Sequence, residues 1–186
     1  MEFITRYSDV DESEVAEATA EKNFNLCLDA VSDIKLDERA EILFVEKELR
    51  GEIQGYKFRG LIDVGLKDKS TGQIMILDHK SAEYPLKADG SVKANKEDVF
   101  YKHKVQLYLY SELYKINYGV YPDYIAWNHF KTGQLLKYKF ERDECEEALN
   151  YLVSIIHQIE NTEEYEKTPS YVMEKYLCEF RHNCWE

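Results

Sequence analysis

Short hydrophobic runs alternate with polar turns through the middle of the chain. Residues 58–66 and 74–80 are rich in Ile, Leu, Val and Phe, and Ser70-Thr71-Gly72 between them has the composition of a turn. Two such runs joined by a short turn predict an antiparallel β-hairpin. The same pattern predicts an earlier strand at 41–50, with a break at Arg50-Gly51-Glu52 before the strand that continues to residue 66.

Hydrophobic residues recur at helical spacing before and after this strand-rich segment. The expected elements in chain order are a helix at 11–32, strands at 41–50, 53–66 and 74–80, a loop at 84–98, a helix at 99–117, strands at 121–130 and 135–140, and a helix at 144–160. Helices on both sides of a strand-rich core predict an α/β fold with a central mixed sheet of about five strands flanked by helices. We expect a single domain over residues 1–186, with its core at about 41–141 and C-terminal helices at about 142–180.

Length and composition agree with one globular domain. The chain has 186 residues, of which 44% are hydrophobic and 32% charged, enough for a substantial core. No apolar run reaches the roughly 18–20 residues that cross a bilayer, and Met1–Arg6 lacks the features of a signal peptide. We therefore expect a cytoplasmic protein with no membrane partner.

The net charge of −12 argues against a broad, nonspecific nucleic-acid surface. Affinity for a phosphate backbone comes largely from Lys and Arg side chains that displace counterions. A group of basic residues nevertheless follows the predicted hairpin: Lys93, Lys96, Lys102, His103 and Lys104. This group predicts a local basic rim, which suits a narrow groove for a single strand better than a surface for duplex.

The hairpin carries the candidate chemistry. Because side chains alternate along a strand, Asp78 and Lys80 share one face and His79 points to the other. If Leu66 or Lys67 pairs with Ile74, Asp63 lies opposite Leu77 or Asp78. Two carboxylates, with the backbone carbonyl of His79 as a further ligand, suit Mg²⁺, and a nearby amine suits a phosphodiester. The alternatives are a structural ion pair between Asp63 and Lys80, and a solvated edge at Asp78 and Lys80.

The helix at 99–117 adds a second pattern. Gln106 and Tyr110 are four residues apart and so lie on one helical face, where an amide and a phenol can position a phosphate or a base. An ordinary amphipathic helix with an exposed Gln106 explains the same spacing. The histidines His79, His103 and His129 are expected to be surface or packing residues.

Taken in order, Gly60-x-x-Asp63, Asp78-x-Lys80 and Gln106-x-x-x-Tyr110 resemble the motifs of the RecB-type branch of the PD-(D/E)XK nuclease superfamily. The resemblance implies a restriction-endonuclease-like core and a metal-dependent deoxyribonuclease, as in the exonucleases of recombination, repair and phage DNA processing. It implies that Asp63 and Asp78 bind Mg²⁺ or Mn²⁺, that Lys80 orients water or stabilises charge, and that Gln106 and Tyr110 organise the site. Glu46 resembles an additional acidic metal-binding position, and Glu48 has the same facing.

The chain departs from that branch in two respects. Its first histidine is His79, whereas members often carry one in the N-terminal helical region; either the site works without it or the chain begins later than its relatives. Relatives with an iron–sulfur cluster use four cysteines, one before the nuclease core and three near the C-terminus. In this chain only Cys178 and Cys184 occupy a comparable tail, so no cluster is expected. Cys27 and Cys145 are expected to be core thiols.

The expected function is DNA hydrolysis in a bacterial or phage-infected cell, with exonuclease action on ends or single strands favoured. A structure-specific endonuclease and a non-catalytic nucleic-acid-binding or assembly module are the alternatives. The acidic chain and its short basic loop also suggest a helicase or recombination partner that delivers DNA.

Overall fold

The computed structural model describes residues 39–81, 84–130 and 132–163. The predicted helix at 11–32, with Cys27, and the tail cysteines Cys178 and Cys184 lie outside these residues. The chain divides into two compact units, residues 1–151 and residues 152–186, with the boundary inside the last described helix. The sheet and the candidate site belong entirely to the first unit.

The described elements follow the expected order of strands and helices. They are β1 (Ala40–Ile53), β2 (Tyr56–Asp68), β3 (Ile74–Lys80), the short 3₁₀ helix η2 (Ala94–Lys96), α2 (Glu97–Tyr118), β4 (Tyr124–His129), β5 (Gln134–Lys139) and α3 (Arg142–Asn161). None of the helices in this part of the chain has an apolar stretch long enough to cross a membrane.

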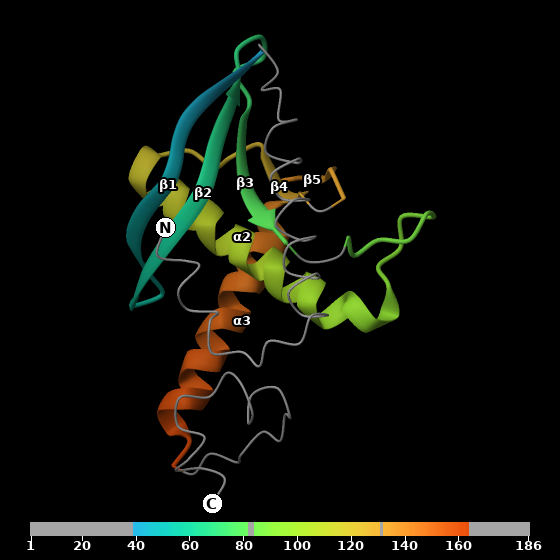
Figure 1. The fold of residues 1–186 in the computed structure, drawn as a ribbon. Helices are drawn as coiled ribbons and strands as arrows, with labels where there is room; N and C mark the ends of the chain where they lie inside the picture. The colour runs from blue at the N-terminus through green and yellow to red at the C-terminus, as the bar shows by residue number, and fades with distance from the viewer. Residues whose placement is uncertain (1–38, 82–83, 131, 164–186) are drawn as a thin grey trace, which may run out of the picture. The chain divides into compact units, whose positions relative to one another are not determined.

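The five strands form one mixed sheet in the order β1-β2-β3-β4-β5 (Figure 1). Neighbouring strands are antiparallel except β3 and β4, which are parallel. A parallel pair needs a long crossover, and α2 provides it while packing against β1, β2, β3 and β4. The expected α/β fold with a five-stranded mixed sheet flanked by helices is confirmed.

The turn between β1 and β2 differs from the prediction. The strands continue through Arg50-Gly51-Glu52, which pair with Lys57–Arg59, and the chain reverses at Gln54 and Gly55. Both turn residues have positive φ, 51° and 86°. Two successive residues with positive φ match the twist of a two-residue hairpin. The predicted break was wrong because hydrogen bonding to β2 continues across Gly51.

The turn between β2 and β3 is where the sequence placed it. The Asp68 carboxylate accepts hydrogen bonds from the backbone N–H groups of Ser70 (2.8 Å) and Thr71 (3.0 Å), and Gly72 has a φ of 74°. Lys67 pairs with Ile74 and the ladder continues to Val64 and Leu77. This is the register that brings Asp63 level with Asp78.

The core of the first unit lies between the sheet and α2. Its most deeply buried large side chains come from β2, β3, β4 and α2: Ile62, Ile76, Leu107, Tyr108, Leu113, Ile125 and Trp127. Cys145, at the start of α3, is 2% exposed and its Sγ lies 3.7 Å from the Tyr108 carbonyl. The prediction that Cys145 is a core thiol is confirmed.

Candidate active site

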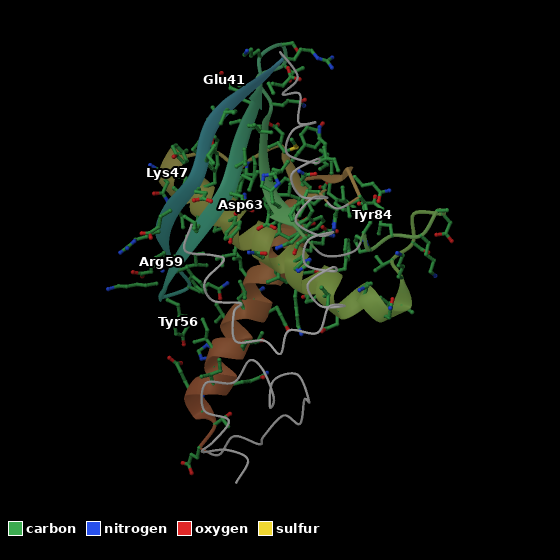
Figure 2. All side chains as sticks on the ribbon, viewed as in Figure 1. Glu41, Lys47, Tyr56, Arg59, Asp63 and Tyr84 are labelled. Atoms are coloured by element: carbon green, nitrogen blue, oxygen red, sulfur yellow. The ribbon has the colours of Figure 1, made fainter. Side chains whose placement is uncertain are left out.

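Asp63 is fixed at the point where the β2–β3 ladder ends. The last pair of that ladder is Val64 with Leu77, and Asp63 and Asp78 are the next residues along the two strands. Beyond this pair a side chain, and not the backbone of β2, accepts the hydrogen bond from β3: Asp63 Oδ2 accepts it from the backbone N–H of His79 at 2.7 Å. The carboxylate of β2 is thereby held against β3, beside Asp78. Figure 2 shows Asp63 in the middle of β2, Lys47 on the neighbouring edge strand β1, and Arg59 nearer the β1–β2 turn.

Asp78 and Lys80 form a buried ion pair. The Asp78 residue is 4% exposed, and Lys80 Nζ lies 2.6 Å from its Oδ2. Burial raises the pKa of Asp78, and the charge of Asp63 adds to this, while the nearby Lys80 ammonium opposes it. The pair is therefore neither a solvated edge nor an ion pair of Lys80 with Asp63, because Lys80 contacts Asp78 and both groups are shielded from water.

Helix α2 supplies the other half of the site. Lys80 Nζ donates a hydrogen bond to Gln106 Oε1 at 2.9 Å, and Gln106 Nε2 donates one to Tyr110 Oη at 2.8 Å. Burial raises the pKa of Tyr110, and the charges of Asp78 and Asp63 act in the same direction against the Gln106 hydrogen bond. The five side chains predicted from three separate sequence motifs thus meet: Asp63, Asp78, Lys80, Gln106 and Tyr110.

The strand β1 does not complete this group with a third carboxylate. Glu46 is exposed and has a φ of 45°, at the point where the β1–β2 pairing passes from Val45–Val64 to Lys47–Ile62. Glu48 is engaged elsewhere, because its carboxylate lies 2.6 Å from Arg50 Nε and 3.6 Å from an Arg59 nitrogen. Within the described residues, no three His, Cys, Asp or Glu side chains gather in a way that would hold a metal ion.

The donor set of the remaining pair nevertheless suits a hard divalent cation. Asp63 and Asp78 offer only carboxylate oxygens, which Mg²⁺ and Mn²⁺ prefer. Asp78 Oδ2 is buried, and although Lys80 is close to it, no group in the described part of the chain donates a well-directed hydrogen bond to it. Mg²⁺ is usually bound by one or two carboxylates and completes its coordination with several waters and phosphate oxygens, so two carboxylates are sufficient for such a site. The carbonyl of His79 stays a predicted ligand.

Two lysines of the expected basic rim are paired with carboxylates, and a third contacts a backbone carbonyl. Lys102 Nζ lies 2.7 Å from Asp98, Lys104 Nζ lies 2.7 Å from Glu144, and Lys93 Nζ donates to the Tyr84 carbonyl at 3.0 Å. The lysines are grouped in the sequence, but acidic residues of α2 and α3 compensate two of them. These ion pairs reduce the basic character expected at Lys102 and Lys104, and the local basic rim as a whole stays a prediction.

The predicted loop that carries Lys93 is itself ordered by backbone hydrogen bonds. Lys87 N–H donates to the Ser91 carbonyl at 2.8 Å, and Lys93 N–H donates to the Pro85 carbonyl at 2.9 Å. Leu86 and Val92 form an isolated antiparallel bridge, so residues 85–93 make a small hairpin. Its last residues lead into η2 and α2, which carries the site residues.

The histidines divide in a way that the sequence did not reveal. His79 is exposed, and its Nδ1 lies 3.1 Å from Asn128 Nδ2, whereas His129 is 3% exposed with the Tyr84 ring edge-on to it. His103 is partly buried on α2, and the charges of Lys80 and His129 both act on it. The prediction of a packing role fits His129. For His103, its spacing of three residues from Gln106 was the feature of the sequence that indicated a position on the same helical face.

Comparison with known proteins gives a distant likeness. No family model matches the sequence, and no curated protein matches it significantly. A similar solved structure is a crystal structure from Eubacterium rectale whose protein is called a "putative exonuclease". The two share 18% sequence identity with a TM-score of 0.49, over 82% of this chain and 65% of that one. This chain thus spans less than two thirds of the length of that protein.

Proposed function

We propose that this protein is a divalent-metal-dependent nuclease that hydrolyses DNA phosphodiester bonds, acting as an exonuclease on DNA ends or single strands. The observation that carries the proposal is the position of Lys80. Its ammonium group is held between the buried Asp78 carboxylate and the Gln106 amide, next to a second carboxylate fixed by the backbone of β3.

Asp63 and Asp78 would hold the metal ion. Each has its orientation fixed by the fold, Asp63 through the His79 N–H and Asp78 through burial beside Lys80. When bound there, Mg²⁺ or Mn²⁺ supplies Lewis-acid activation of a phosphate and of a water molecule. The metal would also offset the burial of the Asp78 carboxylate and its repulsion by Asp63.

Lys80 would stabilise the negative charge that develops on the phosphate during hydrolysis. A preorganised cation is effective in such a site because it needs little reorganisation when the charge appears. The hydrogen bond from Lys80 to Gln106 fixes the ammonium group, and Tyr110 fixes the amide in turn. Gln106 is thus a positioning residue for Lys80, and Tyr110 for Gln106.

The test is a cleavage assay with purified full-length protein. End-labelled linear single strands, linear duplex and circular DNA are incubated with Mg²⁺, Mn²⁺ or EDTA, and the wild type is compared with Lys80→Ala. We expect metal-dependent digestion of linear DNA, no cleavage of circles, and loss of activity in Lys80→Ala. Glu48→Gln is a matched control, because it removes an exposed carboxylate that pairs with Arg50 and Arg59.

The other outcomes identify the alternatives. Cutting of circles indicates an endonuclease, and DNA binding without cleavage by folded protein indicates a non-catalytic module. Equal cleavage by the wild type and Lys80→Ala contradicts the proposed role of the central ammonium group.

A further inference from the structure

His103 lies on the same helical face as the two α2 residues of the candidate site. It precedes Gln106 by three residues and Tyr110 by seven, and all three lie within the continuous helix α2. Residues at these spacings are stacked along one side of a helix. The hydrogen bond between Lys80 and Gln106 fixes which side this is, because it turns the face toward the end of β3.

The strand ends opposite that face carry Lys80 and His129. These two residues are partners in the parallel β3–β4 pairing, and α2 packs against both strands. The His103 imidazole is close enough to both for their charges to lower its pKa to about 4, although burial is the larger cause. The side chain is therefore neutral near pH 7, and His103 extends the site along α2 beyond Gln106.

The imidazole of His103 has hydrogen-bonding capacity to offer a ligand. It is only partly buried, and within the described residues it makes no hydrogen bond. Its neighbours on the helix differ, because Lys102 and Lys104 are both held in ion pairs. A neutral imidazole provides one N–H donor and one acceptor nitrogen.

We propose that His103 binds the substrate, donating a hydrogen bond from its neutral imidazole to a phosphate oxygen of the bound DNA strand beside Lys80. The inference rests on the proposed function, since it places the phosphate backbone along the face formed by Lys80, Gln106 and His103. It assigns a substrate-binding role to a residue of α2 that lies outside the pair Gln106 and Tyr110.

The test compares the wild type with His103→Ala and His103→Asn. Asparagine keeps an N–H donor, whereas alanine removes it. Binding of a fluorescently labelled single-stranded oligonucleotide is followed by anisotropy at neutral pH, in Ca²⁺ and separately in EDTA, over a series of salt concentrations. Steady-state cleavage with Mg²⁺ gives kcat and KM, and thermal unfolding shows whether each variant is folded.

We expect His103→Ala to weaken binding by about three- to tenfold, the effect of one neutral hydrogen bond. His103→Asn should bind within about twofold of the wild type. Because the contact is neutral, the salt dependence of binding should be unchanged, whereas a cation on a single strand contributes about 0.7 to the slope. KM should rise in His103→Ala with kcat nearly constant.

The remaining outcomes distinguish failure of the inference from failure of the proposed function. If the wild type cleaves DNA and folded His103→Ala binds as tightly as the wild type, the inference fails while the proposed function stands. If binding depends on His103 but no metal-dependent cleavage occurs, the proposed function fails while the contact stands. Absence of any DNA binding by the wild type overturns both, and equal weakening in His103→Asn and His103→Ala rules out the N–H donor.

Discussion

Gly60 lies directly against the ring of Tyr110. A Cβ atom built on Gly60 would be 2.9 Å from Cδ1 and Cε1 of that ring and 3.0 Å from Leu113 Cδ1. Carbon atoms do not approach this closely without displacement of one of them. The absence of a side chain at Gly60 therefore lets Tyr110 reach the position from which it binds Gln106.

Gly60→Ala should accordingly weaken both the fold and the site. The added methyl group meets two side chains in the core, so we expect a loss of about 1–3 kcal/mol in the free energy of unfolding. Chemical denaturation measures this loss. Displacement of Tyr110 should also reduce cleavage under conditions in which the variant remains folded, and a stability within about 0.5 kcal/mol of the wild type would contradict the close contact.

Gln106→Leu and Tyr110→Phe should reduce the cleavage rate in a coupled manner. Leucine removes both hydrogen bonds of the amide, which frees the Lys80 ammonium group to move. A displacement of about 1 Å of a catalytic group can lower the rate by about a hundredfold. Tyr110→Phe removes only the bond to Gln106 and should cost about tenfold or less. Single-turnover rates of both variants and of the double variant measure how the hydrogen bonds from Lys80 to Gln106 and from Gln106 to Tyr110 contribute to cleavage.

The double variant decides whether the two residues act through each other. If Tyr110 works by holding Gln106, adding Tyr110→Phe to Gln106→Leu should have almost no further effect on the rate. Additive losses would show that Tyr110 acts independently of the amide.

Divalent metal should stabilise the folded protein through Asp63 and Asp78. An ion present at about 100 times its Kd stabilises the native state by about 2.7 kcal/mol if it binds the folded state alone. We expect Mn²⁺ to raise the unfolding temperature of the wild type, EDTA to reverse the increase, and Asp63→Asn and Asp78→Asn to abolish it. Glu48→Gln should respond like the wild type, and a metal-induced increase that survives in both aspartate variants would place the ion elsewhere.

The stability of the protein should fall as the pH decreases from about 6.5 toward 4, in part because of His103. Its pKa is lowered to about 4, chiefly by burial and further by Lys80 and His129. Within this window the unfolded state binds more protons than the folded state at this residue, so the free energy of unfolding rises with pH and levels off above the ordinary histidine pKa.

His103→Asn should flatten this part of the profile. Chemical denaturation at a series of pH values gives the pH dependence of the free energy of unfolding for both proteins. An NMR titration gives the pKa of His103 directly, and its imidazole resonance is identified as the one missing from the spectrum of the variant. A His103 resonance that titrates near the ordinary histidine pKa of about 6.5 would falsify the partly buried position of the side chain near Lys80 and His129.

Local patterns were enough to predict the elements and most of the site. Alternation along β3 predicted that Asp78 and Lys80 share a face. The polar turn between β2 and β3 predicted that Asp63 lies opposite Leu77 or Asp78, and the register in the structure selects Asp78. A four-residue spacing on α2 predicted that Gln106 and Tyr110 point the same way. These relationships depend on strand and helix periods and on one short turn, which are properties of neighbouring residues.

Other features depend on contacts between distant segments, and only the tertiary structure decided them. The parallel pairing of β3 with β4 places His129 beside Lys80, and the packing of α2 on the sheet adds His103 to the same group. The turn moved to Gln54 and Gly55, because strand pairing continues through Gly51.

Charge compensation was also a tertiary property. The lysines after β3 looked like a basic rim in the sequence, but the Glu144 carboxylate of α3 reaches Lys104 from 40 residues away. Glu46 looked like a further ligand, yet the backbone at this residue has a positive φ and its side chain is exposed. The sequence by itself thus determined which groups could form the site, through local periodicity. The fold decided which of them meet, because burial and long-range pairing set the distances between their charges.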